Sequence, residues 1–220
     1  MTAVPRQSRR RVAPAGPRRR DRVPLRVVLV PGLGDRMGWL VWLQRQGLRT
    51  WRSLGVRTAV FRVGWSSDAR FADRTAALLD VVRGYEARGE RVVVVGASAG
   101  AGAALAVLAE HPTLAAAVLV VGKFRHPGHL PDPVLTYNDV FDESLHAVPR
   151  LLERIGPAER ARVLSLRSAK DGIVPDADPV LPGAVNERMR VVGHVTAIGF
   201  ALVFRARRIV AFARAAAARL

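Results

Sequence analysis

The sequence predicts a doubly wound α/β fold, in which a mostly parallel six-stranded sheet is flanked by helices. Two observations lead to this prediction. From residue 25 onward, six short aliphatic runs alternate with helical patterns. The runs are continuously apolar, which suits strands covered on both faces, as in parallel sheets. The composition, with 50% hydrophobic and 24% charged residues among 220, fits one globular domain.

The elements alternate as strand–helix–strand units with right-handed crossovers require. The expected strands are residues 26–30, 57–63, 91–95, 116–121, 162–166 and 188–192. The expected helices lie near residues 38–53, 69–87, 99–110, 145–155 and 195–217. The long irregular stretch at about 122–148 is rich in Pro, Asp and His, and we expect it to form a cap-like insertion.

The first 22 residues differ in composition from the rest. They hold eight arginines and one acid, so they supply +7 of the net charge of +17. Having almost no large apolar residues, segment 1–22 is expected to be a disordered basic tail ahead of a domain at 23–220. Such a tail attracts anionic surfaces weakly and non-specifically. Arg outnumbers Lys 33 to 2 throughout, which indicates compositional bias, so we expect no specific nucleic-acid partner.

Several classes of protein are excluded or disfavoured by what the sequence lacks. There is no cysteine, which excludes a disulfide scaffold, a thiolate metal site and a cysteine nucleophile. No run of 18 uncharged apolar residues occurs, so we expect no membrane span. The basic start is followed by no apolar signal-peptide core, which favours the cytoplasm. The histidines and acids of the cap stretch match no ligand spacing, so no metal is expected; they are His126, His129, His146, Asp132, Asp139 and Asp142.

A G-x-S-x-G pattern, Gly96-Ala97-Ser98-Ala99-Gly100, lies directly between the third strand and an Ala-rich helix. This pattern is typical of a serine at the apex of a sharp strand-to-helix turn. Small residues flank the serine because the backbone is crowded there. The following helix points its N-terminus at the serine, which favours developing negative charge.

The same glycines allow a second interpretation. Residues 96–102 also read G-x-x-x-G-x-G, which resembles the dinucleotide-binding turn of short-chain dehydrogenases. However, that turn follows the first strand of its fold. Those enzymes also need a Tyr and a Lys four residues apart, whereas Tyr85 is followed by Gly89 and Tyr137 by Phe141. A dinucleotide-binding oxidoreductase is therefore the weaker alternative, beside a purely structural glycine turn.

Two later strand ends carry the partners that a serine nucleophile needs. Asp171 lies in Asp-Gly-Ile-Val-Pro and His194 in Val-Gly-His-Val. The order Ser98, Asp171, His194 is the chain order of α/β-hydrolases. With Val-Pro-Gly-Leu-Gly after the first strand, the chain resembles that family over about residues 25–217. The two leading strands of larger members are missing, which leaves a compact version with strand order 2-1-3-4-5-6.

The resemblance implies a role for each matching residue. Ser98 would be the nucleophile, His194 the general base and then acid, and Asp171 the residue that orients His194. The backbone N–H groups of Leu33 and Ala99 would form the oxyanion hole. The chain has Pro31-Gly32 where many members have His-Gly, a small departure because the donor is a backbone group.

Each assignment has an alternative. His194 could cap the last helix, and Asp171 could be a turn residue, in which case Asp176 or Asp178 would supply the acid. His111 is expected to cap a helix and Asp35 to begin a helical turn. The tryptophans are expected in the core or a pocket wall, and Trp65, at the carboxyl edge, is the best candidate for a substrate contact; the others are Trp39, Trp42 and Trp51.

The sequence therefore predicts a cytoplasmic serine hydrolase that acts on a small-molecule substrate with an ester, thioester or related acyl bond. The resemblance implies no cofactor and no metal. The main alternative is a binding or scaffold protein that keeps the fold without useful activity.

Overall fold

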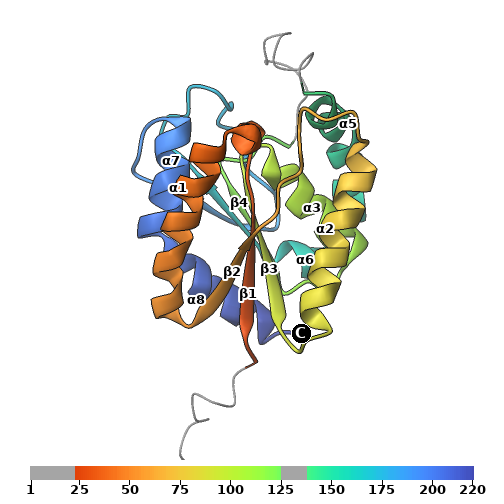
Figure 1. The fold of residues 1–220 in the computed structure, drawn as a ribbon, viewed down its shortest axis with the longest axis vertical. Helices are drawn as coiled ribbons and strands as arrows, with labels where there is room; N and C mark the ends of the chain where they lie inside the picture. The colour runs from red at the N-terminus through yellow and green to blue at the C-terminus, as the bar shows by residue number, and fades with distance from the viewer. Residues whose placement is uncertain (1–22, 125–137) are drawn as a thin grey trace, which may run out of the picture.

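The computed structural model describes residues 23–124 and 138–220, in which six parallel strands form one sheet. The strand order is β2-β1-β3-β4-β5-β6, which confirms the expected order (Figure 1). The strands are β1 (Leu25–Val30), β2 (Val56–Val60), β3 (Arg91–Ala97), β4 (Ala116–Val120), β5 (Val163–Arg167) and β6 (Val185–Arg188).

Helices cover both faces of the sheet, as Figure 1 shows. On one face lie α1 (Gly38–Arg49), α7 (His194–Phe204) and α8 (Ala206–Ala217). On the other lie α2 (Phe71–Glu86), α3 (Gly100–Glu110), α5 (Asp139–Arg154) and α6 (Pro157–Arg160). Two short 3-10 helices, η2 (Leu33–Arg36) and η3 (Thr50–Leu54), precede and follow α1.

The central strands send alternate side chains into two separate cores, which explains their continuous apolar runs. Val92 and Val94 of β3 pack in the core that includes α3, α5 and the buried residues of α2. Val93 and Val95 pack in the opposite core, with α7 and α8. Because side chains alternate across a strand, both sets must be apolar when both faces are covered.

The C-terminal elements differ from the prediction. The sixth strand was expected at 188–192, but β6 spans Val185–Arg188, and Val192 forms only an isolated bridge with Lys170. Its side chains are mostly exposed, so at this edge the backbone pairing rather than an apolar run defines the strand. The single helix expected over 195–217 is two helices that part at Arg205, and Arg205 and Arg208 both pair with Glu187.

The stretch expected to be irregular, about 122–148, is only partly described. Helix α5 already begins at Asp139, six residues before the expected start at 145, and two acids lie in its first turn, where the helix dipole favours them. Residues 125–137, and the tail expected at 1–22, lie outside the described residues. Across 23–124 and 138–220, every helix falls short of the length and apolarity that a bilayer-crossing helix needs.

The tryptophans were expected in the core or a pocket wall, and two of the four do not lie in the core. Trp51 and Trp65 are completely buried, whereas the side chains of Trp39 and Trp42 on α1 are 65% and 60% exposed. Both exposed residues lie on the outward side of α1, whose Val41 and Leu48 point into the molecule. An aromatic residue in a helix is therefore not a sufficient sign of the core here.

A buried carboxylate joins the starts of three strands. Glu90, just before β3, accepts hydrogen bonds from Arg26 of β1 at 2.7 and 3.0 Å and from Arg57 of β2 at 2.9 Å. Arg26 holds the pKa of Glu90 below its ordinary value, although burial opposes this. Glu90 therefore stabilises the fold above the ordinary glutamate pKa, and that contribution is lost as the pH falls through the lowered pKa.

We predict that Glu90→Gln lowers the free energy of unfolding by about 1–3 kcal/mol at pH 7, because two arginines lose their charged acceptor. The difference from the parent should shrink in acid, where the parent carboxylate is itself protonated. Urea denaturation at neutral and acidic pH measures both effects. Glu153→Gln, at an exposed position on α5, is the matched control. Equal stabilities of the two variants would contradict the prediction.

Candidate active site

Ser98 lies at the turn between β3 and α3 in a strained backbone conformation, with φ at 55°. Its N–H donates to the carbonyl of Val120 at 2.9 Å, which ties the turn to the end of β4. A Cβ at Gly96 would lie 2.2 Å from the carbonyl oxygen of Gly100, and one at Gly100 would lie 2.1 Å from that of Val30. Neither position can therefore hold a side chain, which explains the glycines of the motif.

His194, the first residue of α7, is placed against Ser98. Its Nε2 lies 2.8 Å from Ser98 Oγ, and its side chain is only 8% exposed. Gly193, directly before it, has φ at 93°, a conformation that favours glycine. The chain thus turns sharply at Gly193 and aims the imidazole at the serine. The alternative that His194 only caps α7 does not account for this contact.

Asp171, in the loop after β5, contacts the other nitrogen of the His194 ring. Its carboxylate oxygens lie 2.9 and 3.0 Å from His194 Nδ1. The N–H groups of Ile173 and Val174 also donate to Asp171, at 3.1 and 2.8 Å. Burial opposes the ionised carboxylate, yet the bond to His194 and these N–H groups together hold the pKa of Asp171 below its ordinary value.

The ionised Asp171 determines which nitrogen of His194 carries the proton. A carboxylate can only accept, so Nδ1 must donate to it, and in the neutral ring this leaves Nε2 as an acceptor. Nε2 then faces the Oγ–H of Ser98, which can donate to it. The arrangement can therefore take a proton from the serine hydroxyl.

Two backbone N–H groups flank Ser98 without an acceptor. Within the part of the chain that the structure describes, the N–H groups of Leu33 and Ala99 have no hydrogen-bond partner. Gly32 brings the first of these loops against the serine, since a Cβ there would lie 2.8 Å from Ser98 Cβ and 3.2 Å from its Oγ. Leu33 is the first residue of η2 and Ala99 is the N-cap of α3, and unpaired N–H groups at helix N-termini favour an anion.

The other acids near the site have different surroundings. Asp176 is exposed, and neither it nor Asp178 contacts His194. Asp178 is buried and pairs with the buried ammonium of Lys123 at 2.5 Å. The structure thus brings Asp171, and not its two alternatives, to the histidine.

The pair formed by Lys123 and Asp178 is a feature that the sequence analysis missed. It joins the segment after β4 to the loop after β5, across 55 residues of sequence. The local sequence does not reveal the pair, because Lys123 lies between Gly122 and Phe124, Asp178 lies between Ala177 and Pro179, and neither has its partner nearby in the chain. A lysine three residues after the fully apolar strand β4, at the carboxyl edge of the sheet, is the one signal that could have found it.

Trp65, expected to contact a substrate, is a supporting residue instead. Its ring is completely buried, and its Nε1 donates to the carbonyl of Pro31 at 3.0 Å. The ring stacks on Phe71 and meets Phe141 edge-on, with ring centres 6.3 and 6.0 Å away. Because no atom of Trp65 reaches the surface, it steadies the loop before Leu33 and is not positioned to touch a ligand.

Asp35 was expected to begin a helical turn, but it is the third residue of the turn η2, and it is also a buried link between loops. Its carboxylate accepts the N–H of Gly64 at 2.6 Å, which connects the loop after β1 to the loop after β2. Burial raises the pKa of Asp35 above its ordinary value, against the effect of the Gly64 bond. His111 ends α3, as expected, and pairs with Glu86 at 2.8 Å.

The expected absence of a metal site can be checked only in part. Among residues 23–124 and 138–220, no group of three histidine or acidic side chains could hold a metal ion. His146 lies 3.8 Å from Asp142 on the exposed side of α5. His126, His129 and Asp132 lie outside the described residues.

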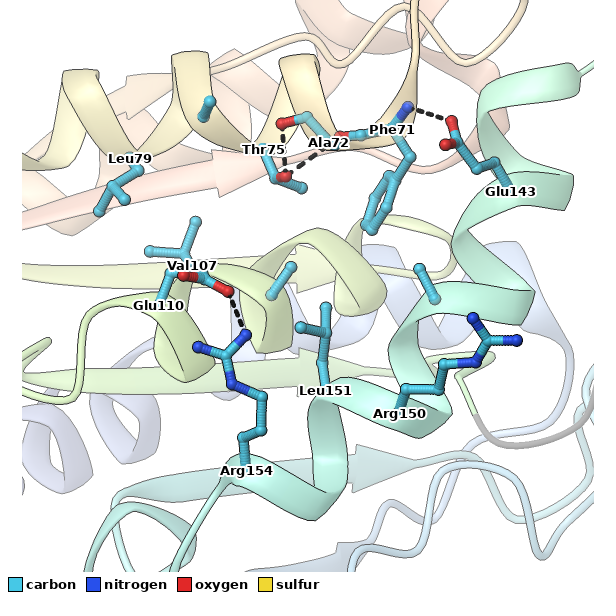
Figure 2. Close-up of a pocket in the computed structure, with 13 residues that line it drawn as sticks. Phe71, Ala72, Thr75, Leu79, Val107, Glu110, Glu143, Arg150, Leu151 and Arg154 are labelled. Atoms are coloured by element: carbon cyan, nitrogen blue, oxygen red, sulfur yellow. Dashed lines mark hydrogen bonds and ion pairs between the residues drawn. The ribbon is translucent and has the colours of Figure 1, made fainter.

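A groove of about 510 Å³ lies in the helical layer of α2, α3 and α5. Ser98, Asp171 and His194 do not line it. Figure 2 shows that Leu79, Val107 and Leu151 contribute to its walls. Arg154 and Glu110, also drawn there, form an ion pair at 2.6 Å. Formed by α2, α3 and α5, this groove is separate from the site around Ser98.

Comparisons with known proteins find similarity in structure but not in sequence. No protein-family model and no curated protein matches the chain. One similar structure is that of a metagenome-derived lipolytic enzyme, at 16% identity and a TM-score of 0.65, covering 86% of this chain and 93% of that one. Another is the esterase domain of a Rhodothermus marinus protein, at 19% identity and a TM-score of 0.61, covering 88% of each chain.

A third similar structure is the monoacylglycerol lipase of Paleococcus ferrophilus, at 14% identity and a TM-score of 0.55. It aligns over 87% of this chain and 94% of its own. At such low identities the likeness concerns the fold. With its parallel sheet in the order β2-β1-β3-β4-β5-β6 and helices on both faces, the chain has the fold of the α/β-hydrolase family.

Proposed function

We propose that this protein is a serine hydrolase that cleaves an ester, thioester or related acyl bond through an acyl-enzyme on Ser98. The observation that carries the proposal is the unbroken line of contacts from Ser98 Oγ through both nitrogens of His194 to Asp171, at 2.8–3.0 Å. The similar structures include a lipolytic enzyme, an esterase domain and a monoacylglycerol lipase, which supports acyl-bond chemistry.

In the first half of the reaction, Ser98 Oγ attacks the acyl carbon while its proton passes to His194 Nε2. The carbonyl oxygen becomes an oxyanion, which the N–H groups of Leu33 and Ala99 stabilise. His194 then gives the proton to the leaving group as its bond to carbon breaks, and the acyl group stays on Ser98. Asp171 remains ionised and stabilises the charged imidazole.

In the second half, water takes the place of the leaving group. His194 removes a proton from the water as its oxygen attacks the acyl carbon, and a second oxyanion forms at the same two N–H groups. The proton returns to Ser98 Oγ when the carbon–oxygen bond to the enzyme breaks, and the carboxylic acid leaves. Every proton-transfer step in this scheme uses His194.

We predict that Ser98→Ala abolishes labelling by a fluorophosphonate probe and lowers the hydrolysis of acyl esters by about 10⁴–10⁶-fold. The variant should keep its circular dichroism spectrum, because alanine fits the space of serine. A screen of p-nitrophenyl esters of increasing chain length measures the activity. A Ser98→Ala protein that hydrolyses esters as fast as the parent would rule out the mechanism.

We predict that Asp171→Asn lowers kcat by about 10⁴-fold, because an amide can turn its NH₂ toward His194 and impose the wrong tautomer. His194→Ala should be comparably damaging, and the double variant scarcely worse, since the residues act as one unit. Asp176→Asn, exposed and without contact to the ring, is the matched control and should stay near parental activity. An inactive Asp176→Asn beside an active Asp171→Asn would reassign the acid.

The oxyanion donors are backbone groups and must be tested through their positions. We predict that Gly32→Ala lowers kcat by about 10²–10³-fold, because its Cβ would press on Ser98 and displace the loop that carries the Leu33 N–H. Gly38→Ala is the matched control, because a Cβ there meets nothing within 4 Å. Equal kcat values for the two variants would show that this loop does not stabilise the oxyanion.

A further inference from the structure

The two helical layers of the sheet differ sharply in charge. The layer of α1, η3, α7 and α8, with the linking Arg205, contains seven arginines and no acidic residue. The opposite layer, formed by α2, α3, α5 and α6, contains nine acidic residues and five arginines. Among the helices, the excess of positive charge is therefore on this one side of the sheet. Glu187 of β6 pairs with two of the seven arginines, Arg205 and Arg208, and within the described residues the other five form no ion pair.

The basic layer also exposes large apolar side chains. On α1 the exposed residues recur at positions i, i+3 and i+4, so they form one outward stripe on the helix. On α7, which is apolar along its whole length, three more residues are exposed. We call these six side chains the α1–α7 face: Trp39, Trp42, Leu43, Val195, Val203 and Phe204.

The two helices of this face are packed together and begin beside the site. Trp51, directly after α1, donates from its Nε1 to the carbonyl of Leu202 in α7 at 2.6 Å. Figure 1 shows α1 and α7 side by side on one side of the sheet. Because His194 is the first residue of α7, the face starts next to Ser98 and extends along the helix for roughly 15 Å.

We propose that the α1–α7 face docks on an anionic lipid surface. Tryptophan and phenylalanine settle at the boundary between headgroups and acyl chains, and arginines around them attract anionic headgroups. The absence of acids from this layer removes the repulsion that such a surface would otherwise exert. The proposal concerns binding alone and does not depend on hydrolysis.

Two other occupants fit the face less well. A second copy of the chain, paired through the same face, would set one arginine-rich layer against another, and within the described residues Glu187 already pairs with two arginines of its own layer. Nucleic acid would use the arginines, but it offers no apolar medium for Leu43, Val195 and Val203. A lipid surface satisfies both the charge and the exposed apolar area.

The test uses the full chain and vesicles of phosphatidylglycerol with phosphatidylcholine, compared with phosphatidylcholine alone, in a sedimentation assay. The parent should bind the anionic vesicles and show a blue shift of tryptophan fluorescence as Trp39 and Trp42 enter the lipid. Trp51 and Trp65 are already buried, so they should not contribute to the shift. Combining Trp39→Ser with Trp42→Ser should weaken binding by about tenfold and remove the shift. Both positions are exposed, so the variant should keep the melting temperature of the parent.

A charge-matched pair of variants separates the face from the basic tail. Arg45→Glu with Arg52→Glu alters exposed arginines of the basic layer, whereas Arg83→Glu with Arg150→Glu makes the same change in net charge on the opposite layer. The first pair should weaken vesicle binding at least about tenfold more than the second. The proposal is overturned by equal binding of the two pairs, or by a parent dimer that the Trp39→Ser/Trp42→Ser variant dissociates. A fluorescence shift with duplex DNA but not with vesicles would also overturn it.

Discussion

The site depends on one steric constraint, the direct contact of backbone with backbone where β3 turns into α3. Gly100 lies against the end of β1, and Gly96 against the first turn of α3, at distances that exclude any Cβ. This contact brings the start of α3 close to the sheet and forces Ser98 into its left-handed conformation. Gly32, in the neighbouring loop, is also too close to Ser98 for a side chain, and this close approach brings the loop that carries the Leu33 N–H against the serine. If these glycines carried side chains, Ser98 and the two N–H groups could not lie so close together.

Around this contact, charged and polar groups join loops that the sheet alone would leave independent. Asp35 ties the loop after β1 to the loop after β2, and Lys123 with Asp178 ties the segment after β4 to the loop after β5. Buried charges are costly unless they are paired, so each link favours one arrangement of its loops over others. The loops that carry Leu33 and Asp171 are thereby held on both sides of Ser98.

The sequence predicted the sheet well because both of its faces are covered, which makes the central strands continuously apolar. It predicted the edges poorly: β6 is exposed, and a hydrophobic pattern carries little information where burial is slight. Ser98 could be singled out because it directly follows β3. Asp171 and His194 could be singled out because each lies in the segment that follows a strand at the carboxyl edge, four residues after β5 and six residues after β6. The sequence could not show that Trp65 is buried, because position along the chain does not reveal depth; its ring is completely buried and its Nε1 donates to the carbonyl of Pro31. Lys123 and Asp178 escaped notice because a pair 55 residues apart leaves no local signal.

The distance along the chain between Ser98 and His194 has a consequence for biosynthesis. Ninety-six residues separate the serine from the imidazole that touches it. At a translation rate of about 5–20 residues per second, the ribosome needs on the order of 5–20 s to make that interval. For most of that time the residues of β3 and α3 exist on the nascent chain while the histidine does not. The contact between Ser98 and His194 can therefore form only after α7 has left the exit tunnel.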